Sequence, residues 1–223
     1  MTLVPLDNVD HHDLTVAIRA GAAWGDAADR LPVFPSEFED AQREFPILFR
    51  RDADAVRAVV LLGLRGANLF LAGDRWTTRY VPAVQRRGPF SMAPRDADGE
   101  MVIHVDLGDP RVGAPDGVPV FLPHGGDAPY LRHVTDALRV IDAGADEERA
   151  INGELDAAGL LRPVDTALEA AAGLMAIDVA ALAALPAATL ERLHRTGALR
   201  AAIMAGSSLG NVARLVEWQR HAG

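Results

Sequence analysis

The sequence predicts an α+β fold, in which a mostly antiparallel β-sheet is flanked by helices and the C-terminal part is mainly helical. Short apolar or alternating runs, bounded by turn residues, fill the first 125 residues. A stretch rich in Gly, Pro and Asp follows at 106–127, and from residue 128 apolar residues recur at helical spacing. We therefore expect a single domain, 1–223, that is sheet-rich over 1–125 and helix-rich over 126–223. A β-barrel or a double-stranded β-helix is an alternative form of its sheet.

The strands predicted in the first part are short and separated by Gly, Pro or charged residues. Over 101–107, Val102, His104 and Asp106 alternate with two apolar residues, as on a strand with two distinct faces. The other predicted strands are 14–18, 31–34, 46–49, 58–64, 68–72 and 118–122. Between the strands, Ser36 followed by Glu39 is typical of a helix start, and a helical turn is expected over 78–85.

The second part shows the spacing of amphipathic helices. One helix is predicted by an apolar stripe of Tyr130, Val134, Ala137, Leu138 and Ile141. A second helix is expected to follow over 152–158. A last hairpin of 160–169 with 174–177 is expected, although its alanine-rich composition would suit helix equally well. Pro186 opens a further helical region, with breaks predicted at Gly197 and over 206–208.

Composition excludes several classes of function. The formal net charge is −9, whereas binding to a phosphate backbone rests on many cationic contacts, so we expect no nucleic-acid partner. The chain has no Cys, which excludes disulfides, thiolate metal sites and cysteine nucleophiles. All 22 basic residues are Arg. No apolar run is long enough to cross a bilayer and the first residues do not resemble a secretory signal, so we expect a cytoplasmic protein without a membrane span.

The stretch from Trp76 to Phe90 concentrates large aromatic and cationic side chains in a chain that is only 5% aromatic. Such side chains are enriched at the centres of binding surfaces. The predicted binding residues are Trp76, Tyr80, Arg86, Arg87 and Phe90. In the alternative interpretation the three aromatic residues fill the core, and Arg86 and Arg87 alone face an acidic partner, to which two guanidinium groups are suited. An Asp or Glu of the same chain would satisfy these two arginines equally well.

This stretch, together with segments along nearly the whole chain, resembles the SapC family of bacterial proteins. The residues that carry the resemblance are Glu37-Phe38, Phe45-Pro46-Ile47-Leu48-Phe49, Leu62-Gly63-Leu64, Asn68-Leu69-Phe70, Trp76, Tyr80-Val81-Pro82-Ala83, Arg86-Arg87-Gly88-Pro89-Phe90, Asp106 with Asp109, Leu160-Leu161-Arg162-Pro163, Ile177-Asp178, Leu190 to Leu199, and Ser208-Leu209. The chain departs from the family at Gly88, where an aromatic residue is usual.

The resemblance implies a non-catalytic binding or accessory protein more than an enzyme. The family takes its name from a surface-layer association, and members resemble accessory proteins encoded near outer-membrane receptors, oxygenases and halogenases. No agreed catalytic residues come with it. We therefore expect a peptide or protein partner, acidic at the contact, in cell-envelope modification, surface-layer or uptake systems, and no cofactor.

One triplet suggests an enzyme instead. His104 and Asp106 lie two apart on a predicted strand, so both side chains face the same side, as two ligands of a non-haem iron site would. His124 is the predicted third ligand, with His133 and His194 as further choices, and Arg200 or Arg214 would hold the 2-oxoglutarate carboxylate. The alternative function is therefore an Fe(II)- and 2-oxoglutarate-dependent dioxygenase acting on a peptide or small molecule. Asp106 has a second interpretation, in which its carboxylate caps the loop that follows the strand.

Overall fold

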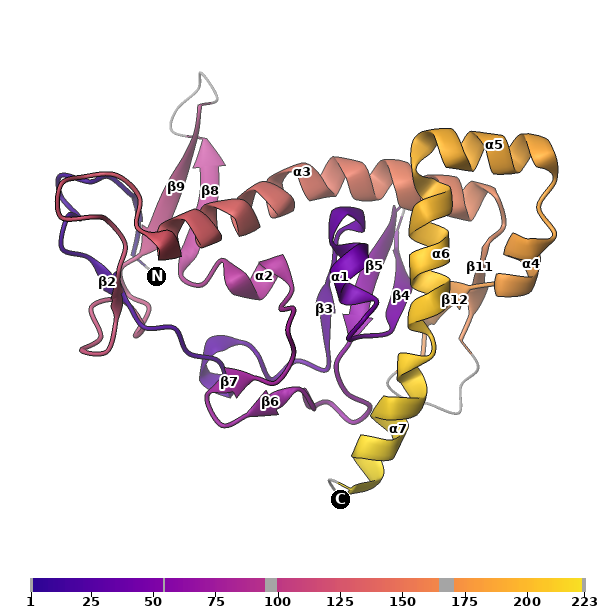
Figure 1. Cartoon of the computed structure of the whole chain (residues 1–223), viewed down its shortest axis with the longest axis horizontal. Helices are drawn as coiled ribbons and strands as arrows, with labels where there is room; N and C mark the ends of the chain where they lie inside the picture. Colours follow the sequence, from indigo (N-terminus) through magenta and orange to yellow (C-terminus); the bar gives the residue numbers. More distant parts are fainter. Residues whose placement is uncertain (1, 54, 95–99, 165–170, 222–223) are drawn as a thin grey trace. The chain divides into compact units, whose positions relative to one another are not determined.

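The computed structural model describes residues 2–53, 55–94, 100–164 and 171–221 (Figure 1). Over these residues the α+β class is confirmed, because the strands pair antiparallel and helices flank the sheets. The chain divides into two compact units. Unit 1 comprises residues 1–20 and 83–142, and unit 2 comprises residues 21–82 and 143–223.

The sheets of the described residues are open, with three, five, two and two strands. A barrel needs its first and last strands to pair, whereas the three-stranded sheet has the order β1-β9-β8 and the five-stranded sheet the order β11-β12-β4-β5-β3. A closed barrel is therefore wrong for this part of the chain. A double-stranded β-helix is also wrong here, because it needs eight strands in two facing sheets and these sheets have three, five, two and two strands.

Unit 1 consists of two small sheets and the first part of a long helix. Strand β9 lies between the other two strands of its sheet, and β2 pairs with β10. The elements are β1 (Leu3–Pro5), β2 (Thr15–Val16), α2 (Ala83–Arg86), β8 (Phe90–Pro94), β9 (Met101–Asp106), β10 (Val118–Pro119) and the start of α3 (Pro129–Ala157).

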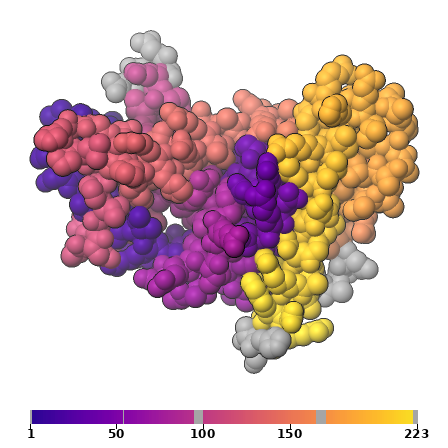
Figure 2. All heavy atoms as spheres, viewed as in Figure 1, coloured from indigo at the N-terminus to yellow at the C-terminus, as the bar shows by residue number. Residues whose placement is uncertain are grey.

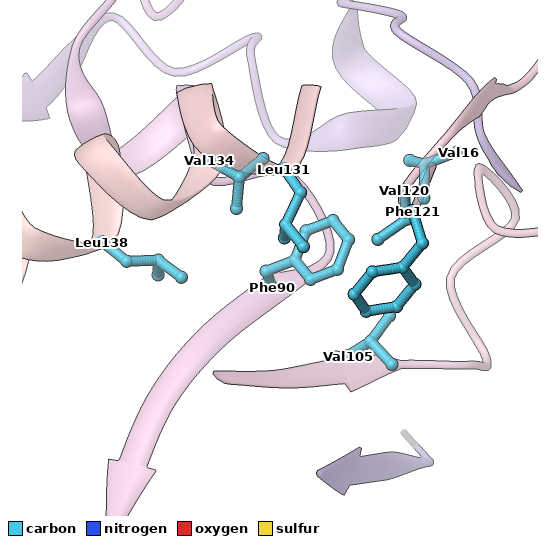
Figure 3. Packing of buried hydrophobic residues seen from close by; sticks show 8 residues of the cluster. All are labelled: Val16, Phe90, Val105, Val120, Phe121, Leu131, Val134 and Leu138. Atoms are coloured by element: carbon cyan, nitrogen blue, oxygen red, sulfur yellow. The ribbon is translucent and has the colours of Figure 1, made fainter. Parts of the chain in front are cut away.

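The core of unit 1 forms where one face of the β1-β9-β8 sheet meets the first turns of α3 (Figure 3). Phe90 and Val105 are partners across β8 and β9, and both are fully buried. The cluster consists of Val16, Phe90, Val105, Val120, Phe121, Leu131, Val134 and Leu138. Val134 and Leu138 belong to the apolar stripe that the sequence predicts for this helix.

Unit 2 is built on the five-stranded sheet, in which β4 and β5 form the central hairpin. The strands of the unit are β3 (Arg30–Pro32), β4 (Ile47–Asp52), β5 (Ala55–Leu61), β6 (Leu71–Ala72), β7 (Arg75–Trp76), β11 (Leu161–Pro163) and β12 (Leu174–Ile177). Its helices are η1 (Ala22–Trp24), η2 (Pro35–Glu37), α1 (Phe38–Ala41), the second part of α3, α4 (Val179–Ala183), α5 (Ala187–Thr196), α6 (Ala198–Ser208) and α7 (Asn211–His221).

Helix α6 packs closely against the sheet because its inner face is made of small residues. Ala201, Ala202 and Ala205 are buried on that face, and α6 contacts β12, β4 and α1. Figure 2 shows α6 (yellow) directly beside α1 (indigo). The break predicted over 206–208 is wrong: α6 continues through Ser208, whose buried hydroxyl accepts a hydrogen bond from the backbone N–H of Ile47 at 2.8 Å. The break predicted at Gly197 is confirmed.

The helix start predicted at Ser36 is also wrong. Glu37 is buried and its carboxylate accepts a hydrogen bond from the backbone N–H of Phe34 at 3.0 Å, so the capping interaction begins two residues earlier. Glu39 instead forms ion pairs with Arg43 and Arg200.

Two predicted helices form one continuous helix, α3. The sequence predicts one helix with an apolar stripe that ends at Ile141 and a second over 152–158. Gly144 lies between them, and glycine weakens a helix. In the structure a Cβ atom at residue 144 would lie 2.3 Å from the ring of Phe34, so glycine allows this ring to pack against the helix. The expected last hairpin is confirmed as the pairing of β11 with β12; residues 165–170 of its predicted first strand lie outside the described residues.

None of the helices in the described ranges is both long and apolar enough to cross a membrane.

Glu148 gives unit 2 a pH dependence that can be measured. Its carboxylate accepts a hydrogen bond from the N–H of Ala58 at 2.8 Å and contacts Arg57, while burial raises its pKa above the usual value. A raised folded-state pKa stabilises the protein most below the unfolded pKa, near 4.5, and this contribution is lost as the pH rises through the folded value. The free energy of unfolding of the wild type, relative to Glu148→Gln, should therefore fall between pH 4 and pH 7 in urea titrations. The exposed Asp146→Asn on the same helix should show no such fall, and a difference that grows with pH would contradict the assignment.

Candidate functional site

The turn between α2 and β8 holds the side chain of Arg87 back over its own backbone. The Arg87 Nη1 donates a hydrogen bond to the carbonyl of Phe90 at 2.7 Å, and the N–H of Phe90 donates to the carbonyl of Arg87 at 3.1 Å. Gly88 lies inside the turn with φ of 56°, a left-handed conformation that favours glycine. The guanidinium group of Arg87 is therefore positioned by the turn and is half-buried.

A second arginine of unit 1 lies near Arg87 and has its own acidic partner. Arg111 donates to the carboxylate of Asp109 through Nε at 3.0 Å and through Nη2 at 2.7 Å. The two side chains are 12% and 17% exposed. Burial alone would raise the pKa of Asp109, but the hydrogen bonds and the charge of Arg111 hold it below the usual value. Asp109 is therefore a carboxylate at neutral pH.

Arg87 has no such acidic partner in the part of the chain that the structure describes. Its one hydrogen bond there is the donation from Nη1 to the Phe90 carbonyl. Burial lowers the pKa of the Arg87 guanidinium, and the nearby charge of Arg111 lowers it further. An arginine does not lose its proton in a protein, so Arg87 stays cationic. Of these two arginines, Arg111 has a carboxylate partner and Arg87 has none among the described residues.

Tyr130 adds a neutral donor beside the turn. Its ring packs edge-on against Phe90, with ring centroids 6.1 Å apart, and its hydroxyl lies 3.0 Å from the position that a Cβ atom at residue 88 would take. Burial raises the pKa of Tyr130 to about 12, so the hydroxyl is protonated at neutral pH. Within the described ranges this hydroxyl has no hydrogen-bond partner. Gly88 therefore leaves open the space next to a free O–H group.

We name the four side chains Arg87, Asp109, Arg111 and Tyr130 the Arg87 cluster. Its charges sum to about one positive charge, and its unused groups are N–H and O–H donors. Such a set attracts an anion and hydrogen-bonds to its oxygen atoms.

The aromatic residues predicted for binding take up framework positions. Phe90 is fully buried in the core of unit 1. In unit 2, the indole N–H of Trp76 donates to Asp26 at 2.9 Å, and the hydroxyl of Tyr80 donates to Glu37. These contacts favour the alternative interpretation in which the aromatics support the fold. Arg86 is half-buried at the end of α2, next to Arg87.

The predicted metal ligands are placed as follows. Asp106 Oδ1 accepts hydrogen bonds from the backbone N–H groups of Thr2 at 2.7 Å and Gly108 at 3.0 Å, as a loop-capping carboxylate does. His104 Nδ1 lies 3.3 Å from the carbonyl of Val102, and His124 is exposed in the loop before α3. A search of the described residues finds no group of three His, Asp or Glu side chains suited to a metal ion.

The other residues predicted for that site are engaged elsewhere or exposed. Arg200 pairs with Glu39, and Arg214 donates to the carbonyl of Glu44 while it stacks on the rings of Phe70 and Trp218. His133 and His194 are exposed, on α3 and α5.

Sequence reasoning missed three members of the Arg87 cluster. Asp109 and Arg111 stand two apart in a Gly- and Pro-rich stretch, a spacing that is compatible with a local bidentate pair. Tyr130 was assigned only to the apolar stripe of its helix. No sequence pattern connects these residues with Arg87. Arg111 lies 24 residues and Tyr130 lies 43 residues after Arg87 in the chain.

Comparison with known proteins gives one match. The sequence model of a protein family described as SapC matches residues 6–215. No curated protein and no solved structure matches the chain.

The pair of Asp109 and Arg111 should stabilise unit 1 above about pH 4. Because the pKa of Asp109 is lowered in the folded state, its contribution is present above the unfolded value and is lost as the pH falls through the folded one. Asp109→Asn should therefore lower the free energy of unfolding by about 1–2 kcal/mol at pH 7, and by less at pH 3. Chemical denaturation at both pH values measures this difference. Asp116→Asn, which removes the exposed pair with Arg19, is the control and should cost less at pH 7. An equal loss at both pH values for Asp109→Asn would contradict the assignment.

Proposed function

The chain belongs to the SapC family, and from that premise we propose that it is a non-catalytic binding or accessory protein that recognises an acidic side chain of a peptide or protein partner. Arg87 is the residue that we assign to the contact. The cell-envelope, surface-layer or uptake setting of such a partner is part of the proposal and rests on the family resemblance alone.

The observation that carries the proposal is the state of Arg87. Its guanidinium is half-buried, is fixed by the carbonyl of Phe90, and lacks an acidic partner within the described residues. Removing a charge from water without a partner costs free energy, and arginine cannot escape this cost by losing a proton. A carboxylate from outside the chain would supply the missing charge, and the unused N–H groups of Arg87 would bind its oxygen atoms.

The charge of the cluster favours a carboxylate over a phosphate group. Asp109 stays ionised beside Arg111, so the four side chains together carry about one positive charge. A carboxylate with one negative charge balances this sum. A phosphate group with nearly two negative charges would leave an excess close to Asp109, which repels it.

Tyr130 and Arg111 have supporting roles in this proposal. The Tyr130 hydroxyl lies next to Gly88, on the same turn as Arg87, and can donate to a bound carboxylate oxygen. Arg111 already uses Nε and Nη2 on Asp109, so its contribution is mainly the field of its charge.

The dioxygenase remains an alternative prediction, with His104, Asp106 and His124 as its ligands and Fe(II) and 2-oxoglutarate as its cofactors. The carboxylate of Asp106 accepts two backbone hydrogen bonds, and His124 is exposed in a loop. Nothing in the described arrangement favours this function over the binding protein.

The proposal is tested with a peptide that carries one carboxylate. We expect acetyl-Ala-Glu-Ala-amide to cause saturable changes in the backbone NMR signals of residues 87–90, at millimolar concentration. The same peptide with Gln in place of Glu should bind at least tenfold more weakly, because a hydrogen bond to a charged group contributes about 1.5–3 kcal/mol. Arg87→Ala should abolish the changes, and Arg87→Lys should weaken binding because it retains the charge but loses the planar donors.

Two controls separate recognition from folding. Arg79→Ala removes an exposed guanidinium from the same sequence stretch and should leave binding unchanged. Circular dichroism should show that Arg87→Ala remains folded, with a midpoint lowered by a few degrees through loss of the bond to Phe90. Equal binding of the Glu and Gln peptides, or unchanged binding by the folded Arg87→Ala variant, would overturn the proposal.

A further inference from the structure

Unit 1 has a second feature that can bind a ligand, a cleft of about 290 Å³ that shares no residue with the Arg87 cluster. Apolar side chains of the core line one part of the cleft, and polar groups line the rest. Phe121 and Leu131 belong to the core of the unit and are almost fully buried (Figure 3). Leu6 and Ile103 are partly buried against the same core, and the N–H of Leu6 donates to the carbonyl of Ile103 at 2.8 Å. The apolar part of the cleft is therefore fixed by the core and by the β-sheet.

Two carboxylates from separate segments line the same cleft. Asp7 is held in place because its Oδ1 accepts hydrogen bonds from the N–H groups of Val9 and Asp10, both at 2.9 Å. These bonds, that of Asp10 first, lower the pKa of Asp7, so it is ionised at neutral pH. Asp127 is exposed, and its carboxylate makes no ion pair with the described residues. The nearest guanidinium, Arg132, donates to the backbone carbonyl of Asp127 at 3.1 Å.

An apolar surface with acidic groups beside it matches one kind of side chain. Lysine has a stem of four CH₂ groups that can lie on apolar surface while its charged end reaches polar groups. Its ammonium group is compact and has three donors, so it can approach two carboxylates from different segments. Arginine differs because its planar fork fits a single carboxylate best. This chain contains arginine but no lysine, so a second copy of the chain cannot supply the lysine side chain.

We propose that this cleft binds a lysine side chain of a peptide or protein partner, with the stem on the partly buried Leu6 and Ile103 and the ammonium group between Asp7 and Asp127. The contact is independent of the carboxylate contact at Arg87.

The test uses Nα-acetyl-lysine-amide as the probe, followed by NMR on the full chain. Saturable shifts are expected at residues 6–8 and 126–127. Nα-acetyl-norleucine-amide, which has an apolar side chain without the ammonium group, should bind about tenfold more weakly. The double variant Asp7→Asn/Asp127→Asn should weaken lysine binding about five- to tenfold, because each partly exposed ion pair contributes modestly. Asparagine at position 7 retains the acceptor oxygen that holds the turn, so the fold is expected to persist.

Asp142→Asn is the matched control, since it removes an exposed carboxylate from α3 in the same unit. It should leave lysine binding unchanged. Any of three results would overturn the proposal: no saturable shift at these residues, equal binding of the norleucine and lysine probes, or an equal loss in the Asp142→Asn protein.

Discussion

The hydrogen bond from the guanidinium of Arg87 to the carbonyl of Phe90 is the interaction on which the candidate site depends. It spans the turn between α2 and β8, beside the backbone hydrogen bond from the N–H of Phe90 to the carbonyl of Arg87. From this turn Phe90 enters the core of unit 1 and pairs with Val105 across the sheet. The same turn places Gly88 beside the hydroxyl of Tyr130. The turn thus holds the guanidinium group of Arg87 in one half-buried position.

The two arginines of the cluster show how differently the fold treats the same group. Arg111 has a bidentate carboxylate partner, so its charge is balanced within the unit. Arg87 has a carbonyl partner, which satisfies one donor, and no described residue compensates its charge. Stability alone would be served by a second carboxylate or by an apolar residue at position 87. The half-buried charge of Arg87, which the described residues do not balance, is therefore a reason to look for a partner outside the chain. Such an unbalanced cation is unexpected in a protein whose net charge is −9.

The sequence predicted the fold well where local patterns decide it. The strands near 47–49, 58–61 and 101–106 follow from apolar runs and alternation, and the helix break at Gly197 follows from glycine at a helix end. It failed at Gly144, which lies inside a continuous helix where the ring of Phe34, distant in sequence, packs closely. It also failed at a local contact, because Glu37 caps the N–H of Phe34, whereas Ser36 is the predicted N-cap. Strands β1 and β8 were missed because their short, proline-containing sequences have no clear period. Arg87 was found as a candidate from composition, whereas Arg111 and Tyr130 come near it only through the fold.

The most direct measurement of the central claim follows the Arg87 side chain itself. In the ¹⁵N NMR spectrum of the arginine side chains, the Nε–H signal of Arg87, assigned by its loss in Arg87→Lys, should shift and saturate as acetyl-Ala-Glu-Ala-amide is added. The signal of Arg79 should remain in place, because that exposed guanidinium is not assigned to the contact. An Arg87 signal that does not move while the peptide still binds, or that moves no more than the signal of Arg79, would contradict the account.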